Sequence, residues 1–369
     1  MTSRALINQE SFMKKILVAF MTACVVFLAG CSKIEVKNEK GWWTDYDECL
    51  KAASESGKKI MMVISADEVE KSGETLKQEL FYTEVFMQKY QDEYEFCEID
   101  VSPSLIVNAF PKNNIPEAIR NDKAKTRKFL NEHKKGQRDA AKILEKRMKI
   151  MATFDVTHRP MMVFITKEGY PIADVQYFPS AQIETFDEII EYYSPRITEY
   201  LTLVETAHNS TGLDRVKAID DLYNRTSNSY RYHLTELMRE IPKLDKENKS
   251  QLVGKYLLAL ATSDTIDATI ARKPHKIAQI YEKVAKNKFL SKQEQQQAYF
   301  AELYIIGKNS PTDKELKQMK ALLDKIILLD PSSPIGMQAA SKLEQLNEFI
   351  KRREEYEKKI KEESEGSDN

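Results

Sequence analysis

The sequence has few of the residues that build common catalytic and metal sites. Its 369 residues include four cysteines and five histidines, and neither type recurs at a spacing that binds a metal ion. It has no glycine-rich phosphate loop and no Gly-x-Ser-x-Gly stretch, which argues against nucleotide-binding and serine-hydrolase sites. Basic and acidic residues nearly balance, at 56 and 57, so the overall charge gives no reason to expect a nucleic-acid partner.

One apolar run, residues 16–28, stands near the start of the chain. Two lysines precede it, and small residues follow it before Cys31. A positive start, an apolar centre and small residues at the exit are typical of a secretory signal. The run is too short to span a bilayer comfortably as a mature helix. Met13 lies just before the lysines and offers a second start for translation.

The stretch Leu28-Ala29-Gly30-Cys31 resembles the lipobox of bacterial lipoproteins. The resemblance implies cleavage before Cys31 and covalent diacylglycerol and fatty acyl groups, such as palmitate, on that residue. Several acyl chains at one terminus give stable membrane attachment. We therefore expect a protein anchored on the extracytoplasmic side of the cell envelope, with no other cofactor, and Ser32 leaves the inner and the outer membrane open. An ordinary signal peptide in which Cys31 is incidental is the alternative.

Residues 42–200 alternate between helical spacing and buried-type apolar runs. Ser180 is expected to cap a helix, and Gly136 is expected to interrupt a basic helical insert near residues 116–151. This alternation predicts an α/β domain with a mixed sheet flanked by helices. The other predicted helices cover residues 45–56 and 74–90, and the predicted strands cover residues 59–65, 94–101, 160–166 and 170–177.

Beyond residue 200 only helical spacing is found, which predicts an all-α domain of helical hairpins. A helix that ends in Leu329-Asp330-Pro331 before a new helix resembles the tetratricopeptide repeat, although no matching repeat period is found. A plain helical bundle is the alternative. The predicted division is a signal peptide (1–30), a lipidated tether (31–41), the α/β domain (42–200), the helical domain (201–352) and a charged disordered tail (353–369).

Several short motifs in residues 42–193 occur in a fixed order, and they are Trp43, Lys58-Lys59-Ile60, Leu76-Lys77-Gln78-Glu79-Leu80-Phe81, Phe86, the strand over residues 96–100, and Arg159-Pro160. This order resembles the thioredoxin-like fold of exported proteins. The resemblance implies that the peptide bond before Pro160 is cis and that this proline faces the active site of redox members.

The chain departs from this family where redox members carry Trp-Cys-x-x-Cys. Counted back from Leu76, the two cysteine positions hold Glu70 and Gly73, and the position of a buried acid holds Val63 or Ile64. Dithiol exchange needs a thiolate, and the expected mature chain has no Cys-x-x-Cys anywhere. We therefore expect a redox-inactive domain and no enzyme activity.

Cys49 and Cys97 are the cysteines that remain once the signal is removed and Cys31 carries lipid. In the resembling fold the first helix packs on the strand that carries Cys97, so a disulfide between the two is a candidate in an oxidising compartment. Two buried free thiols are the alternative. An envelope thiol–disulfide or other enzyme with an atypical site near Pro160, Cys49 or Cys97 is the alternative to a noncatalytic protein.

Charges are separated along the first domain. Residues 67–100 contain 11 acidic and three basic residues, whereas residues 120–149 contain 12 basic and four acidic residues. The basic stretch could bind an anionic surface or a partner of opposite charge, but charged helical faces are usually only solvated. We expect two solvated faces that partly neutralise one another.

Together these patterns predict a binding or scaffold protein of the cell envelope. Its contact with the membrane is expected to run through the lipid on Cys31. The redox-inactive thioredoxin-like domain and the helical domain are expected to offer surfaces to a protein partner, which the sequence does not identify. Neither a metal ion nor a nucleic acid is expected as a ligand.

Overall fold

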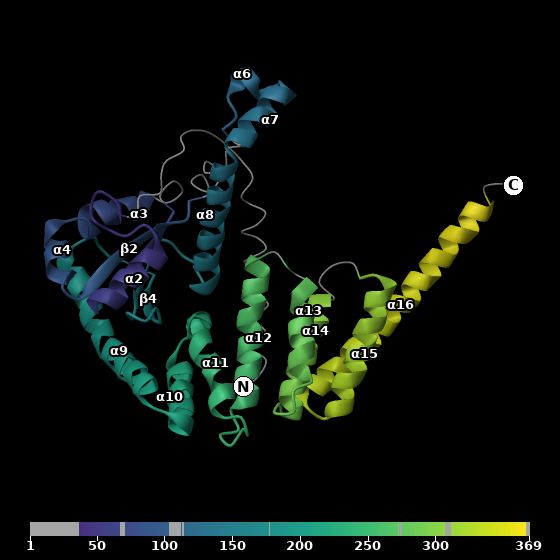
Figure 1. Cartoon of the computed structure of the whole chain (residues 1–369). Coiled ribbons are helices and arrows are strands. Elements are labelled where there is room, and N and C mark those ends of the chain that lie inside the picture. Colours follow the sequence, from purple (N-terminus) through teal and green to yellow (C-terminus); the bar gives the residue numbers. More distant parts are fainter. Residues whose placement is uncertain are drawn as a thin grey trace. The chain divides into compact units, whose positions relative to one another are not determined.

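The structure is a computed structural model that forms two compact units, each described here by itself (Figure 1). The first unit comprises the described residues up to Ser210 together with Ala218–Leu234, and the second comprises Thr211–Lys217 and the residues from Thr235 onward. The predicted signal peptide, Cys31 and Glu70 lie outside the described residues. The structure describes residues 37–66, 71–102, 112, 114–176, 178–271, 273, 275–306 and 311–366.

A four-stranded mixed sheet forms the centre of the first unit. Its strands are β1 (Lys59–Ser65), β2 (Tyr94–Asp100), β3 (Met161–Ile165) and β4 (Pro171–Val175), in the order β2-β1-β3-β4. β1 is parallel to β2 and antiparallel to β3, and β4 is antiparallel to β3. The two central strands are apolar and buried along almost their whole length, because helices cover both faces. The predicted mixed sheet flanked by helices is therefore confirmed.

The first predicted helix is α2 (Tyr46–Ser56), which covers one face of the sheet. Asp45 caps it, because its side chain accepts the N–H groups of Asp47 and Glu48. Gly57 ends it in the left-handed conformation, with φ 77°, which a residue with a Cβ adopts only with strain.

The single helix predicted over residues 74–90 is wrong. The structure has α3 (Lys71–Leu76), a π-helical turn η1 (Lys77–Phe81) and α4 (Glu84–Tyr90) in that region. The chain leaves the helix and starts a new one because Thr83 acts as an N-cap, its side chain accepting a backbone N–H of α4.

The basic insert is helical as predicted, but its interruption lies elsewhere. It consists of α6 (Glu117–Arg120), α7 (Lys123–Glu132) and α8 (Lys134–Thr153), so Gly136 lies inside a helix. The break falls at His133, whose backbone has left helical geometry. The ring of His133 stacks on the ring of Phe129 in α7, and this contact stabilises the bend.

α9 (Ile183–Asn209) begins two residues later than a cap at Ser180 requires. The hydroxyl of Ser180 instead pairs with the hydroxyl of Thr185 and accepts the N–H of Gln182, and Gln182 is the N-cap residue. The prediction of Ser180 as the cap is therefore wrong, because its hydroxyl is engaged before the helix starts. α9 also continues through residue 200, where the sequence placed the domain boundary.

A segment assigned by sequence to the helical domain packs into the first unit. It comprises most of α10 (Gly212–Arg225) and the 3-10 helix η3 (Asn228–Leu234). Tyr230 is buried in the core under α2, and its hydroxyl donates to Asp174 Oδ1 at 2.6 Å. The ring of His233 packs 4.2 Å from that of Phe154, measured between centroids.

The buried imidazole of His233 makes the first unit sensitive to acid. Burial lowers the pKa of His233 to about 3, although its Nε2 contacts the carbonyl oxygen of Thr153 at 3.1 Å. The unfolded chain takes up a proton near the ordinary histidine pKa of about 6.5, whereas the folded chain does not. The free energy of unfolding therefore keeps its full value above that pH and falls below it. Between pH 7.5 and 5 the loss is expected to be about 2 kcal/mol.

Urea unfolding at the two pH values measures this loss as the difference between wild type and His233→Gln. The matched control is His158→Gln, because His158 is exposed and should retain the wild-type pH dependence. Equal pH dependence in wild type and His233→Gln would show that the buried imidazole is not responsible.

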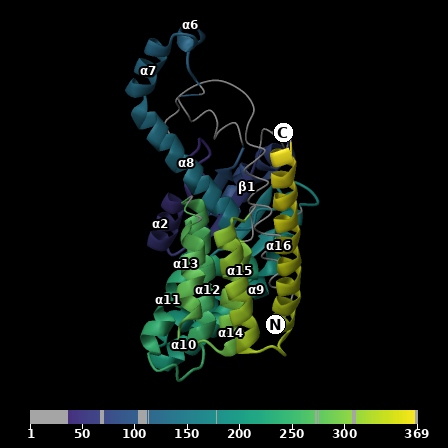
Figure 2. The ribbon, with the colours of Figure 1, turned by 90° about the vertical axis from the view of Figure 1, so that its right-hand side faces the viewer.

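The second unit is a succession of helices in which each packs on the next. α12 also contacts α14, and α14 contacts α16, so alternate helices stack on one another (Figure 1, Figure 2). This arrangement confirms the predicted helical C-terminal region. The helices are α11 (Thr235–Leu244), α12 (Val253–Ile270), α13 (His275–Ala285), α14 (Lys292–Ile306), α15 (Asp313–Leu329) and α16 (Pro334–Gly366).

The predicted disordered tail is helical over most of its length. α16 continues to Gly366, which includes residues 353–366 of the predicted tail. Charged pairs one turn apart support this exposed helix, and one joins Arg353 Nε to Glu357 Oε1 at 3.0 Å. No helix in the described part of the chain is both long enough and apolar enough to cross a membrane.

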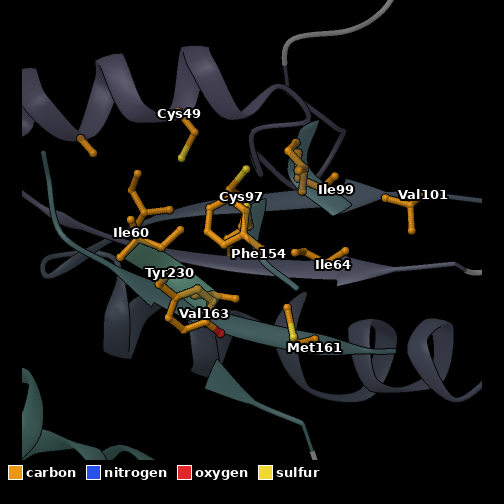
Figure 3. Close-up of a cluster of buried hydrophobic side chains, with 14 of the residues drawn as sticks. Cys49, Ile60, Ile64, Cys97, Ile99, Val101, Phe154, Met161, Val163 and Tyr230 are labelled. Atoms are coloured by element: carbon orange, nitrogen blue, oxygen red, sulfur yellow. The ribbon is translucent and has the colours of Figure 1, made fainter. Parts of the chain in front are cut away.

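Apolar cores lie on both faces of the sheet. On one face, side chains of α2, the sheet and η3 form the cluster in Figure 3, which includes Cys49, Cys97 and Tyr230. On the other face an aromatic cluster surrounds Trp42, whose ring lies 5.0 Å from that of Phe96, measured between centroids. Successive side chains of β2 therefore enter opposite cores, as the two-residue period of a strand requires.

Candidate functional site

One edge of the sheet includes Pro160, the position at which the thioredoxin-like resemblance implies a cis peptide bond. β1 and β2 both end there, at Ser65 and Asp100, which are paired in register. β3 begins there with Met161, directly after Pro160, and the Arg159–Pro160 peptide bond is cis. We refer to Ser65, Asp100 and Pro160 together as the sheet-edge site.

Among the described residues the sheet-edge site offers hydroxyl and carboxylate groups but no thiol. Ser65 is buried, and its Oγ makes no hydrogen bond within the described part of the chain. Ser102 is buried as well, and its N–H donates to Asp100 Oδ1 at 2.8 Å. Gly73 is buried in α3, whereas Glu70 lies outside the described residues. Redox members carry their second cysteine at the position of Gly73, and glycine has no side chain.

The position at which the resemblance implies a buried acid is aliphatic. Val63 and Ile64 are both buried in β1, and neither can accept a proton. Activation of a thiol requires such a group or a nearby positive charge. Over the described residues the sheet-edge site thus lacks both the nucleophile and the buried base of dithiol exchange.

The two remaining thiols lie away from this edge. Cys49 is in α2 and Cys97 is in the middle of β2, opposite Met62 of β1. Both are free and completely buried, so the candidate disulfide is not formed in the structure. Burial, and then a hydrogen bond with Cys49, raise the pKa of the Cys97 thiol well above its ordinary value. A buried thiol with a raised pKa is a poor nucleophile, which disfavours an atypical redox enzyme built on Cys97.

On the opposite face of the sheet, four polar side chains form a buried network that the sequence did not predict. Glu98 of β2 accepts hydrogen bonds from Lys77 Nζ, from the Tyr82 hydroxyl and from Asn38 Nδ2, the last at 2.8 Å. The side chains of Lys77 and Glu98 are only 4% and 13% exposed. A charge at this depth is stable only when it is paired and hydrogen-bonded, as it is here.

This network fastens the last residues of the predicted tether, which covers residues 31–41. Asn38 Oδ1 accepts the N–H groups of Lys40 and Trp42, and its amide reaches Glu98. The first described residues are thereby fixed to β2. The alternation of β2 was the available signal, because it places Glu98 on the same face as the buried Phe96.

The basic insert uses part of its charge within the first unit. Lys146 of α8 binds Asp45 at 2.7 Å and Asp47 at 2.8 Å, which are the cap and the first turn of α2. These two acids lie outside the acidic stretch of residues 67–100, which was the predicted counterpart of the basic insert. Ten other basic side chains of the insert are exposed, and they are Arg120, Lys123, Lys125, Arg127, Lys128, Lys134, Lys135, Arg138, Lys142 and Lys149.

In the second unit, one buried glutamine joins three helices. Gln296 of α14 donates from Nε2 to the carbonyl oxygens of Ile326 and Asp330, both at 2.8 Å. Its Oε1 accepts from Ser333 Oγ at 2.8 Å, and the same Oγ accepts the N–H of Gly336 in α16. The corner around Leu329-Asp330-Pro331 was noted from the sequence. Gln296, which holds this corner, was not predicted.

Neither unit shows a metal centre within its described residues. There, histidine, cysteine, aspartate and glutamate nowhere form a group of three or more that could hold an ion. The five histidines stand apart in the sequence.

Comparison with known proteins gives little beyond this description. No protein-family model matches the chain, and no curated protein matches it. Among solved structures, the chain is similar to one described as "DsbH Oxidoreductase", with a TM-score of 0.28 and 17% sequence identity, over 47% of this chain and 96% of that chain. The class of the protein therefore rests on the strand order and register given above: an α/β domain with a mixed sheet, followed by a helical region.

Proposed function

We propose that this chain is a lipid-anchored protein of the cell envelope in which a redox-inactive thioredoxin-like domain and a helical-hairpin domain bind a protein partner. The strand order β2-β1-β3-β4, with a parallel first pair and an antiparallel second pair, supports the thioredoxin-like assignment. The sheet-edge site carries the proposal, because the chemistry of the redox family is missing from its described residues. The strands at this edge are still in place, so we assign the domain a noncatalytic binding role.

The anchor rests on the sequence Leu28-Ala29-Gly30-Cys31 and on the apolar run before it. Diacylglycerol and a fatty acyl group on Cys31 would hold the chain to a membrane on its extracytoplasmic side. The segment from Cys31 to Asn38 is short, and Asn38 is fixed to β2 through Glu98. The first unit would therefore sit close to the lipid surface.

Replacement of Cys31 by alanine should release the protein from the membrane. The Cys31→Ala variant, expressed at full length, is expected to lose incorporation of labelled palmitate and to move from the membrane pellet to the soluble fraction, because the thiol that accepts the lipid is gone. Cys49→Ala is the matched control and should stay in the pellet. A Cys31→Ala protein that still partitions with membranes would show that the anchor was assigned to the wrong residue.

The helical unit supports the binding role. Stacked helical hairpins present extended surfaces, and the tetratricopeptide-like corner at Leu329-Asp330-Pro331 belongs to such a hairpin. Large apolar side chains are exposed on its last two helices, and they are Leu328, Met337, Phe349 and Tyr356. Phe349 and Tyr356 are seven residues apart in α16, so they lie on one face of the helix, and an apolar face of this kind supports contact with another protein.

Chemical crosslinking of intact membranes, followed by capture of the full-length chain, tests for this partner. The expected result is a discrete adduct that disappears when Phe349 and Tyr356 are both changed to serine. The matched control changes Glu344 and Lys351 of the same helix to serine and should leave the adduct in place. An adduct of equal yield in both variants would argue against binding through this surface.

A further inference from the structure

The face of the sheet beneath α2 contains two thiols that meet in the core. Cys49 extends from the middle of α2 and Cys97 from the middle of β2, and Figure 3 shows both side chains directed into the layer between the helix and the strand. The two side chains belong to the same buried cluster, and each residue is 0% exposed. They are also the only cysteines of the sequence beyond Cys31.

The backbone on both sides of this pair is held by contacts that do not involve sulfur. Trp43, just before α2, pairs with β2: its N–H donates to the Phe96 carbonyl at 2.9 Å, and its carbonyl accepts the Glu98 N–H at 2.7 Å. The cap of α2 is in turn bound by Lys146 of α8. Helix and strand are therefore already placed side by side, so a bond between the two sulfur atoms closes an existing contact.

We propose that Cys49 and Cys97 form an intramolecular disulfide that joins α2 to β2 when the exported chain folds in the presence of a disulfide oxidant. This inference rests on the extracytoplasmic location proposed above, because such bonds persist in oxidising compartments. The bond would close the loop of residues 49–97, which contains β1, α3 and α4. Closing a loop restricts the unfolded chain and so stabilises the folded one.

The reaction is ordinary thiol–disulfide exchange. The thiolate of one cysteine attacks a disulfide of the oxidant, which releases one oxidant thiol and leaves a mixed disulfide. The second cysteine then displaces the other oxidant thiol, so the Cys49–Cys97 bond forms while the oxidant disulfide is reduced to two thiols that take up the two protons. Burial would protect the finished pair from this chemistry, so the bond is made during folding, before α2 covers the strand.

Counting thiols in the full-length protein tests the pair directly. Membranes are quenched with acid, the protein is denatured, and free thiols are alkylated before and after reduction. We expect no alkylated cysteine before reduction, two after it, and a linked peptide pair containing Cys49 and Cys97. Alkylation of both cysteines before reduction would overturn the disulfide. Alkylation of Cys31, before or after reduction, would overturn the lipid anchor instead and leave the result for the pair standing.

A second measurement does not depend on where the protein resides. The purified full chain, reduced and denatured in detergent, is refolded with oxidised glutathione. The expected product is the Cys49–Cys97 disulfide, with a thermal midpoint roughly 10 °C above that of the reduced protein. The Cys49→Ala/Cys97→Ala variant should show no response to reductant. Glutathione bound to either cysteine, or two thiols left unreacted, would overturn the proposal.

Discussion

The Lys77→Met variant is expected to lower the free energy of unfolding of the first unit by about 3–5 kcal/mol, the usual cost of breaking a buried ion pair. Methionine fills most of the volume of the lysine stem but removes the ammonium that faces Glu98. The carboxylate keeps the hydrogen bonds from Tyr82 and Asn38, yet it loses its countercharge in a site that water barely reaches. The uncompensated charge, rather than a lost contact, accounts for the size of the effect.

Urea unfolding followed by tryptophan fluorescence measures this loss in the unit concerned. The protein has two tryptophans, Trp42 and Trp43, and Trp42 is buried in the aromatic cluster beside the network. The matched control is Lys71→Met, because Lys71 is exposed at the start of α3 and should change stability by less than about 0.5 kcal/mol. A loss below about 1 kcal/mol for Lys77→Met would mean that the pair is not buried as described.

Gln296→Glu should destabilise the second unit by about 3 kcal/mol. The substitution keeps the shape of the side chain but replaces the amide that donates to two carbonyl oxygens with a second oxygen atom. The carbonyls of Ile326 and Asp330 would then lose their partner and face a carboxylate in a site that is completely buried. Each buried polar group left without a partner costs about 1–3 kcal/mol.

Far-UV circular dichroism during thermal unfolding reports on this change. Gln293→Glu is the matched control, because Gln293 is exposed in the first turn of the same helix. The tryptophan signal should be the same in both variants, since both tryptophans belong to the first unit. Equal stability of Gln296→Glu and Gln293→Glu would contradict the assigned role of Gln296.

The elements predicted correctly are those that carry their signal in one continuous stretch. β1 and β3 read as unbroken apolar runs because both of their faces are buried. The hairpin between β3 and β4 turns at Gly169, whose φ of 89° suits glycine. Helices α11 and α15 of the second unit were visible for the same reason, since each shows an apolar stripe to its neighbours.

The errors have physical causes that a local pattern does not show. Glycine destabilises a helix by only about 1 kcal/mol, so Gly136 is accommodated inside α8 while the bend falls at His133. Residues 218–234 look like any amphipathic helical segment, and only tertiary contacts such as those of Tyr230 and His233 assign them to the first unit.

Much the same holds for the candidate site. The resemblance placed Gly73 in a helix that follows the first strand and a cis bond before Pro160, and the structure has both. Ser65 and Asp100 were not predicted. The partners of Lys77 and Gln296 were not predicted, since each depends on segments that are distant in the chain. A charge in a helix is usually solvated, and nothing local distinguishes the rare one that is buried.

An insulin-reduction assay on the full-length protein in detergent, with dithiothreitol as the reductant, tests the central claim most directly. A Cys-x-x-Cys oxidoreductase serves as the positive control. The absence of a thiol from the described sheet-edge site predicts no precipitation of insulin above the rate with dithiothreitol alone. Reproducible turnover that is lost in Cys49→Ala or Cys97→Ala would contradict this account and identify the chain as an oxidoreductase.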